Sequence, residues 1–273
     1  MSGTAFEGKT VVITGGGGGI GKAAAARFLR EGASLVLSSR RREVLDAARR
    51  ELDPSGERVE LVAGDAGSAA GAQQLVDAAL ARFGRVDVLV NSTGIFRVVP
   101  FLEQTEEQVE EALGSILRPT FYASQAAARA MVGAGDGGAI VNVGSMWALD
   151  AITATPTSAY SAAQAGRHSL TKNLAIELAP HRIRVNTVAL AFVETPAYER
   201  FLTPEQARDV LASVNAFHPL GRHGRPSDVV EAILFYAGDG SHWITGTTMP
   251  IDGGVLAGRN APPPAVAEER VAA

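Results

Sequence analysis

The 273-residue sequence contains no cysteine, and histidine is scarce. The absence of cysteine excludes disulfides, thiolate chemistry and cysteine-ligated metals. The five histidines are scattered and show neither HxxxH nor HxH spacing, which argues against a histidine metal site. We therefore predict that the protein has no metal centre.

Long apolar runs and an excess of basic charge are also missing. No uninterrupted apolar run reaches about 18 residues, the length that can cross a bilayer. The N-terminus lacks the charged-then-apolar pattern of a secretory signal. The net charge of −4 argues against nucleic-acid binding as the main function. We expect no membrane or nucleic-acid partner and a cytoplasmic location.

Apolar strand-like stretches alternate with amphipathic helical stretches along most of the chain. Residues 9–14 (KTVVIT) are β-branched and apolar without alternation, which is typical of a strand buried on both faces. Six further strands are predicted at 34–39, 58–63, 86–90, 138–143, 183–188 and 247–251. Helices are predicted from the glycine-rich loop to about residue 31, and at 41–52, 68–83, 103–131, 158–178 and 226–237. This alternation predicts an α/β fold with a parallel sheet covered by helices on both faces.

The length is compatible with one large domain or two small ones. The sequence has no internal repeat and no Gly- or Pro-rich linker before its end, so we predict a single domain over residues 1–256. Residues 190–225 are punctuated by proline and are predicted to be an irregular excursion over the site. The tail at 257–273 contains a proline run and few core residues, so we expect it to be flexible or to lie on a partner.

A glycine-rich loop, GGGGGIG at residues 15–21, lies between the first strand and the first helix. Such a loop presents backbone N–H groups and a helix N-terminus to an anion such as a pyrophosphate. The alternative is a tight turn that happens to contain spare glycines. The spacing Gly15-x-x-x-Gly19-x-Gly21 differs from the commoner GxGxxG.

Several motifs in order along residues 6–256 resemble those of the short-chain dehydrogenase/reductase family. They are Thr14-Gly15-x-x-x-Gly19-Ile20-Gly21, Asp65, Asn91-x-x-Gly94, Ser145, Tyr160, Arg184-Val185-Asn186, Ile244-Thr245-Gly246 and Ile251-Asp252-Gly253-Gly254. The resemblance implies a Rossmann-type, doubly wound, seven-stranded parallel sheet and a nicotinamide cofactor. It also implies a homotetramer or homodimer.

The resemblance further implies which residues bind the cofactor. Those expected to do so are Thr14, Gly15, Gly19, Ile20, Gly21, Ser39, Arg40, Asp65, Ala66, Asn91, Gly94, Tyr160, Gln164 and Thr195. Among them, Asp65 would contact the adenine and Thr195 the nicotinamide carboxamide.

The end of the second predicted strand bears on the choice between NADP and NAD. An acid there would hydrogen-bond the ribose 2′-hydroxyl of NAD and repel a 2′-phosphate. This sequence has Ser39 followed by Arg40, whose guanidinium could pair with a phosphate. The alternative is a solvated basic start to a helix. We predict NADP as the cofactor, with NAD possible.

Ser145, Tyr160 and Gln164 are the predicted catalytic group. Tyr160 and Gln164 are four residues apart on one predicted helix and so share a face. The resemblance implies that Ser145 polarises a carbonyl while Tyr160 donates or accepts the proton. The family has a lysine at position 164, which lowers the tyrosine pKa, and an asparagine that anchors a relay water at the position of Ile116.

The missing lysine predicts a slow or unusual reductase. A cation about 5 Å from the phenol, at an effective dielectric constant of about 20, is worth roughly 3 kcal/mol, or about two pKa units. We expect the Tyr160 pKa to stay near its ordinary value, which favours carbonyl reduction over alcohol oxidation, and Gln164→Lys to raise the rate. Arg118 is not expected to replace the missing charge, because it points to another side of its helix. Arg167 and His168 are expected at the surface or at an interface.

Aromatic residues near the motifs, including Phe96 and Trp147, indicate a small hydrophobic ketone or alcohol as substrate. Leu190-Ala191 replaces the family's Pro-Gly beside the nicotinamide. Three functions remain open: an NADP-dependent carbonyl reductase, a cofactor-binding regulatory subunit without turnover, and a non-redox enzyme that uses Tyr160 as an acid.

Overall fold

Seven strands form one parallel sheet in the computed structural model, which describes residues 4–196 and 203–258. The strand order is β3-β2-β1-β4-β5-β6-β7. The strands are β1 (Thr10–Thr14), β2 (Ser34–Ser39), β3 (Val59–Ala63), β4 (Val88–Asn91), β5 (Gly138–Ser145), β6 (Ile183–Leu190) and β7 (Thr248–Ile251). β1 pairs with both β2 and β4, so successive connections leave it toward opposite edges of the sheet. The predicted Rossmann-type, doubly wound fold is confirmed.

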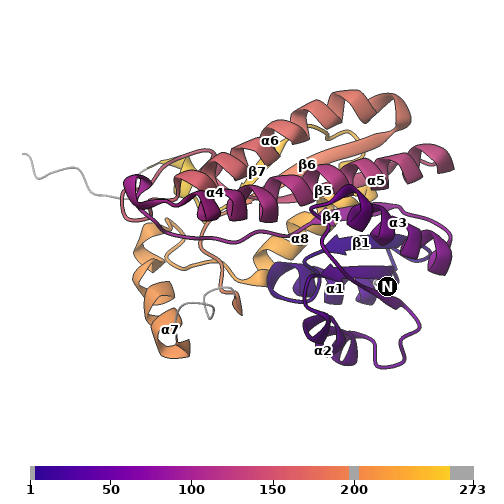
Figure 1. Ribbon diagram of the computed structural model, residues 1–273, viewed down its shortest axis with the longest axis horizontal. Coiled ribbons are helices and arrows are strands. Elements are labelled where there is room, and N and C mark those ends of the chain that lie inside the picture. The colour runs from indigo at the N-terminus through magenta and orange to yellow at the C-terminus, as the bar shows by residue number, and fades with distance from the viewer. Residues whose placement is uncertain (1–3, 197–202, 259–273) are drawn as a thin grey trace, which may run out of the picture.

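Helices cover both faces of this sheet (Figure 1). One face carries α1 (Gly19–Arg30), α2 (Arg42–Leu52) and α8 (Pro226–Ala237), and the other carries α3 (Ala69–Phe83), α5 (Arg118–Ala134) and α6 (Ser158–Leu178). Within the described ranges, no helix combines the length and apolar composition needed to span a bilayer.

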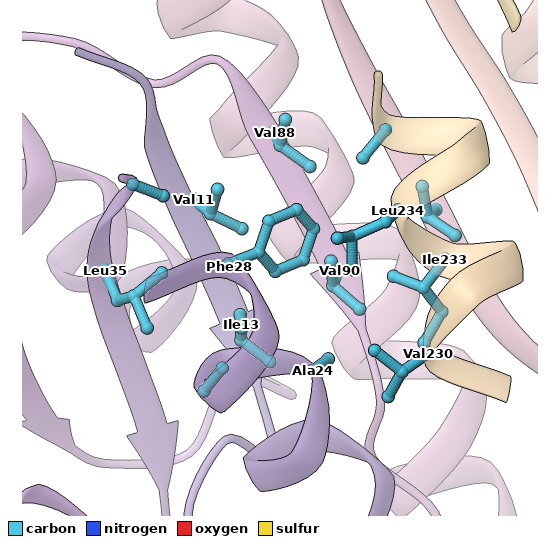
Figure 2. Close-up of a cluster of buried hydrophobic side chains, with 14 of the residues drawn as sticks. Val11, Ile13, Ala24, Phe28, Leu35, Val88, Val90, Val230, Ile233 and Leu234 are labelled. Carbon is cyan, nitrogen blue, oxygen red and sulfur yellow. The ribbon is translucent and has the colours of Figure 1, made fainter. Parts of the chain in front are cut away.

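The two hydrophobic cores follow from the alternation of side chains along the strands. Val11 and Ile13 of β1 pack with Phe28 of α1 and Ile233 of α8, as Figure 2 shows. Val12, which points to the opposite face, packs in a second cluster with residues of α3 and α5. Because successive side chains of a strand point to opposite faces, an apolar strand such as β1 contributes to both cores.

The predicted long helix at 103–131 is observed with shifted ends, because helical backbone runs from residue 106 to residue 134 with one π-helical turn inside it. α4 (Glu106–Ala112) begins at Thr105, whose hydroxyl accepts the Gln108 N–H at 3.3 Å while Gln108 Oε1 accepts the Thr105 N–H at 3.1 Å. This reciprocal capping box fixes a new helix start. A wide π-helical turn, Leu113–Leu117, then joins α4 to α5.

The segment predicted to be irregular at 190–225 also contains a helix, α7 (Pro204–Ser213). Its start has the same capping box, with Thr203 and Gln206, and proline at the first position, where the missing N–H costs no hydrogen bond. α7 stands apart from the sheet at one end of the molecule (Figure 1). Most of the tail predicted to be flexible, residues 259–273, lies outside the described residues.

Candidate active site

A cavity of about 700 Å³ opens at the carboxyl ends of the central strands. This is the end of an open α/β sheet at which ligands bind, next to the point where strand order reverses. Twelve of the residues predicted for the site line it: Gly15, Gly19, Ile20, Ser39, Arg40, Asp65, Ala66, Gly94, Ser145, Tyr160, Gln164 and Thr195. Thr14 and Asn91 are fully buried behind its wall, as is Gly21 at the start of α1.

The glycine-rich loop passes close to neighbouring backbone, which leaves no room for side chains at two positions. Gly15 has φ +72°, and a Cβ there would lie 2.8 Å from the Ser92 carbonyl oxygen. A Cβ on Gly21 would overlap the carbonyl of Gly15. α1 begins after Gly18 with no side-chain cap among the described residues and no acid in its first turn. Its first N–H groups therefore suit an anion in the cavity.

Buried polar side chains hold the end of β4 in register with its neighbours. Asn91 donates to Asn142 Oδ1 at 2.9 Å and to Ser124 Oγ at 3.1 Å, and Asn142 donates to Thr171 Oγ1 at 2.8 Å. This chain ties β4 to β5, α5 and α6. The structure thus gives Asn91 a scaffolding position rather than one on the cavity surface.

The end of β2 carries polar and basic side chains but no acid. Ser39 Oγ accepts the backbone N–H of Arg41 at 3.2 Å, which fixes the turn into α2. Arg40 is exposed and lines the cavity. On the far side of the same region, Asp65 Oδ1 accepts the Gly67 N–H at 2.9 Å.

Ser145, Tyr160 and Gln164 come together from two elements. Ser145 ends β5, where its hydroxyl accepts the Trp147 N–H at 3.3 Å. Tyr160 lies in the first turn of α6, and Gln164 lies one turn later on the same face. The Gln164 amide donates to the Tyr160 hydroxyl at 3.1 Å. The predicted grouping of the three side chains is therefore observed.

Burial controls the acidity of Tyr160. It raises the pKa of the phenol above its ordinary value, and hydrogen bonds with Ser145 and Gln164 together with the positive charge of Arg167 oppose it without overcoming it. At neutral pH the phenol is therefore protonated, as the sequence led us to expect. A protonated phenol beside a serine hydroxyl can donate a proton to a developing alkoxide.

Aromatic rings form the wall next to Tyr160. The Phe96 ring packs edge-on against Tyr160 with a centroid distance of 4.9 Å, and Trp147 lies 5.2 Å from Phe96. Phe192 continues the cluster at 5.0 Å from Trp147. Phe96 and Trp147 both line the cavity.

Comparison with known proteins decides the family. The profile described as enoyl-(acyl carrier protein) reductase matches residues 15–256. The chain belongs to the short-chain dehydrogenase/reductase family. It is 36% identical over 252 residues to the 3-oxoacyl-(acyl-carrier-protein) reductase FabG of Thermotoga maritima, covering 92% of this chain and 99% of that protein. It is also 36% identical over 253 residues to the L-xylulose reductase of Mus musculus, covering 92% and 98%.

A solved short-chain dehydrogenase/reductase from Mycobacterium marinum superposes with a TM-score of 0.84 at 30% identity, covering 93% of this chain and 98% of that chain. Like those relatives, the protein is an oxidoreductase of this family, whose members use NAD or NADP. These relatives give no support to the alternative of a regulatory subunit without turnover.

Ile116 lies beside Tyr160, at the position where the family resemblance implied an asparagine. It is fully buried in an apolar cluster with Ala163 and Tyr160. Its carbonyl oxygen accepts hydrogen bonds from Thr120 Oγ1 at 2.7 Å and from Arg167 Nη2 at 3.1 Å. The backbone oxygen at this position is thus already engaged by protein donors, and the side chain offers no polar group to a relay water.

The expectation that Arg167 and His168 lie at the surface or at an interface is wrong. Arg167 is 1% exposed and His168 is 6% exposed. Arg167 follows Tyr160 by seven residues along α6, which is about 10 Å of helical rise. However, helical side chains lean toward the N-terminus, and a long arginine reaches back by about one turn. The spacing 160, 164, 167 places all three residues on one helical face. This spacing in the sequence could have indicated that Arg167 lies near Tyr160.

The His168 side chain holds the backbone of Ser145 through a hydrogen bond. Its Nε2 accepts the Ser145 backbone N–H at 3.3 Å, and its buried Nδ1 has no partner among the described residues. Burial, followed by the charges of Arg167 and Lys172, lowers the pKa of His168 from 6.5 to about 4. The imidazole is therefore neutral at pH 7, as an acceptor at Nε2 requires.

This lowered pKa predicts an acid-sensitive fold. Between about pH 6.5 and pH 4 the unfolded chain protonates the imidazole and the folded chain does not, so stability falls as pH falls. Urea unfolding at pH 7 and pH 4.5 should show that His168 accounts for roughly 3 kcal/mol at most of the lost stability. His168→Gln should flatten this dependence, whereas the exposed His181→Gln should retain it. Equal slopes in all three proteins would contradict the assignment.

Proposed function

We propose that the protein is an NADPH-dependent reductase of a small hydrophobic ketone, with Tyr160 as the proton donor. The observation that supports it best is the position of the Tyr160 hydroxyl. It lies 3.1 Å from the Gln164 amide and beside Ser145, in the same cavity as the glycine-rich loop. A nicotinamide cofactor, when bound, supplies the hydride.

The residues present fit a dinucleotide. The backbone around Gly15 and Gly21 has no space for side chains, and the N-terminus of α1 faces the cavity, which together suit a pyrophosphate. Ser39, Asp65 and Thr195 border the cavity at separate places along its wall. We assign them to the adenosine and nicotinamide ends as the family pattern indicates.

Ser145 and Tyr160 act on the substrate carbonyl oxygen, each in a different way. Ser145 is held by its backbone contact with His168 and can donate a hydrogen bond to a substrate oxygen. Tyr160, protonated at neutral pH because burial raises its pKa, delivers the proton to that oxygen. The reverse reaction needs the tyrosinate, which burial disfavours. Reduction is therefore the preferred direction near neutral pH.

The aromatic wall supports a hydrophobic substrate. Phe96 and Trp147 line the cavity with rings rather than hydrogen-bonding groups, and the Trp147 Nε1–H is already donated to Thr155 at 2.8 Å. A sugar hydroxyl buried against them would lose hydrogen bonds to water without replacement. We infer that a ketone with an apolar substituent binds better here than a ketose.

The direct test is NADPH oxidation across matched carbonyl compounds. We expect aryl and alkyl ketones to give kcat/KM values at least about tenfold above those of ketoses, since one unpaired buried hydroxyl costs about 1–3 kcal/mol. A higher kcat/KM for ketoses would contradict the proposed substrate class. No NADPH oxidation with any carbonyl would contradict the proposed reaction.

Arg40 is proposed to select NADP through the 2′-phosphate. A charge-assisted hydrogen bond contributes about 1.5–3 kcal/mol, so Arg40→Ala should weaken NADPH binding about tenfold or more and leave NADH binding nearly unchanged. Isothermal titration calorimetry of both cofactors measures this. Arg50→Ala, an exposed arginine at the far end of α2, is the matched control and should alter neither affinity. Equal loss of NADH and NADPH affinity in Arg40→Ala would contradict the assignment.

We also propose that residues 1–256 act as one catalytic domain in a cytoplasmic homotetramer or homodimer. A single seven-stranded sheet supports the first part. Large apolar side chains exposed on the described chain, among them Trp243 at 93% and Ile176 at 78%, support association. Light scattering that shows a monomer at working concentration would contradict the oligomer.

A further inference from the structure

The guanidinium of Arg167 lies inside the protein with all its donors engaged. An arginine has five N–H donors. They meet Thr120 Oγ1 at 2.8 Å from Nε, the Val143 carbonyl and Gln164 Oε1 (3.4 Å) from Nη1, and the carbonyls of Thr93 (2.7 Å) and Ile116 (3.1 Å) from Nη2. No donor is left for a substrate or a cofactor. The charge of Arg167 can therefore affect the chemistry only by acting on neighbouring protein groups, such as Gln164 and Tyr160.

Among the described residues, the charge of Arg167 has no acidic partner. All the acceptors are neutral, and no ion pair between Arg167 and a carboxylate occurs in residues 4–196 and 203–258. Burial lowers the pKa of Arg167 to about 10, and a charge on Tyr160 would raise it. The guanidinium thus stays protonated at neutral pH. A buried cation without a counter-ion acts on its surroundings with little screening.

Gln164 connects this cation to Tyr160. Its Oε1 faces Arg167 Nη1 at 3.4 Å, and its Nε2 donates to the Tyr160 hydroxyl at 3.1 Å. A positive charge at the oxygen end of an amide polarises the N–H bonds at the other end and makes them stronger donors. Such a donor favours the negative form of the oxygen that it contacts.

We propose that Arg167 is a positioning residue whose charge, transmitted through the Gln164 amide, stabilises the tyrosinate form of Tyr160. The charge that the family places on a lysine at position 164 is here moved three residues along α6, and a neutral amide bridges the gap. This proposal rests on the proposed function for its catalytic consequence. The electrostatic coupling itself exists whether or not a substrate is turned over.

Other charged groups near Tyr160 do not supply the same effect. Arg97 and Glu111, from the segment after β4 and from α4, border a small cleft beside Tyr160 and pair with each other, with Arg97 Nη2 3.1 Å from Glu111 Oε1. Neither side chain is among the groups that shift the pKa of Tyr160. From α6, His168 is neutral at pH 7 because burial lowers its pKa to about 4. Among charged groups, Arg167 is the one that lowers the Tyr160 pKa.

The alternative is that Arg167 has only a structural role, in which it joins α6 to β5, to α5 and to the segment after β4. Fluorine NMR of protein labelled with fluorotyrosine separates the two roles, because it follows each phenol without substrate or cofactor. The chain has four tyrosines, and Tyr160→Phe identifies the resonance of interest. Fluorination also lowers the phenol pKa and so keeps the titration away from alkaline unfolding.

The decisive pair of variants is Arg167→Gln, which keeps an amide donor and loses the charge, and Arg167→Lys, which keeps the charge. We expect the titration midpoint of Tyr160 to rise by about one to two pH units in Arg167→Gln and to stay near wild type in Arg167→Lys. Equal midpoints in the two variants, whether shifted or not, would overturn the proposal. Arg167 would then have only a structural role. Circular dichroism confirms that each variant is folded.

If the Arg167 variants do not fold, Gln164→Met tests the same link with Arg167 in place. Its Tyr160 midpoint should also rise, and an unchanged midpoint in this folded variant would overturn the relay. Ketone reduction by the same proteins is recorded separately. Absent activity with a shifted midpoint would reject the proposed function alone, and activity with an unshifted midpoint would reject the relay alone.

Discussion

Tyr160→Phe should lower kcat for ketone reduction by about 10²–10⁴-fold, the usual contribution of a positioned general acid. The substitution removes the hydroxyl that receives the Gln164 hydrogen bond and interacts with Ser145. It keeps the ring that packs edge-on against Phe96 at 4.9 Å. The fold and the affinity for NADPH should therefore change little. Steady-state kinetics with the best ketone, together with calorimetry of NADPH binding, measures both effects.

Tyr122→Phe is the matched control, because Tyr122 is half-buried in the core on α5, away from the cavity. It should retain kcat within about twofold. If Tyr160→Phe keeps a tenth or more of the wild-type kcat while chemistry is rate-limiting, another group donates the proton and the assigned role is wrong.

Gln164→Lys should reduce both stability and rate, although the sequence alone suggested a gain. The introduced ammonium would approach Arg167, whose Nη1 lies 3.4 Å from Gln164 Oε1. Two positive charges about 4 Å apart, at an effective dielectric constant of about 20, repel by roughly 4 kcal/mol. We expect a lower urea midpoint and a lower kcat. A rise in kcat with unchanged stability would contradict the position and charge that we assign to Arg167.

The double variant Gln164→Lys/Arg167→Gln separates repulsion from a simple loss of packing. It places one cation where the family has it and removes the other. We expect it to be more stable and more active than Gln164→Lys alone, with a favourable coupling energy of about 1–3 kcal/mol between the two sites. Additive losses from the two changes would mean that the charges do not interact.

The sheet and most helices could be predicted because their signals are local. β2, α6 and α8 have the boundaries that their apolar patterns indicated, and the apolar run of β1 matches its burial on both faces. The start of the long helix was placed three residues too early although the signal was present, since Thr105 and Gln108 form a capping box three residues apart. The same signal at Thr203 and Gln206 marks α7 inside a segment that prolines made appear irregular.

The site was predictable where motifs fix it and not where contacts come from distant segments. Ser145 and Tyr160 were predicted from the family resemblance, and Gln164 from its four-residue spacing from Tyr160 on α6. The burial of Arg167 depends on acceptors from β5, from α5 and from the segment after β4, such as Thr120 and Thr93, which are far away in sequence. No local sequence pattern predicts that a basic side chain will hydrogen-bond to carbonyl oxygens rather than to a carboxylate or to water. The role of Gln164 depends on that contact.

The most direct test of the central claim is to follow deuterium from NADPH labelled at its transferable hydrogen into the product of a hydrophobic ketone. We expect the wild-type enzyme to form an alcohol with deuterium on the former carbonyl carbon, in one-to-one proportion to the NADPH consumed. The Tyr160→Phe enzyme should transfer the same label far more slowly. Product formed without label and without net consumption of NADPH would show instead a non-redox reaction with Tyr160 as an acid, and would contradict the assignment of this protein as a carbonyl reductase.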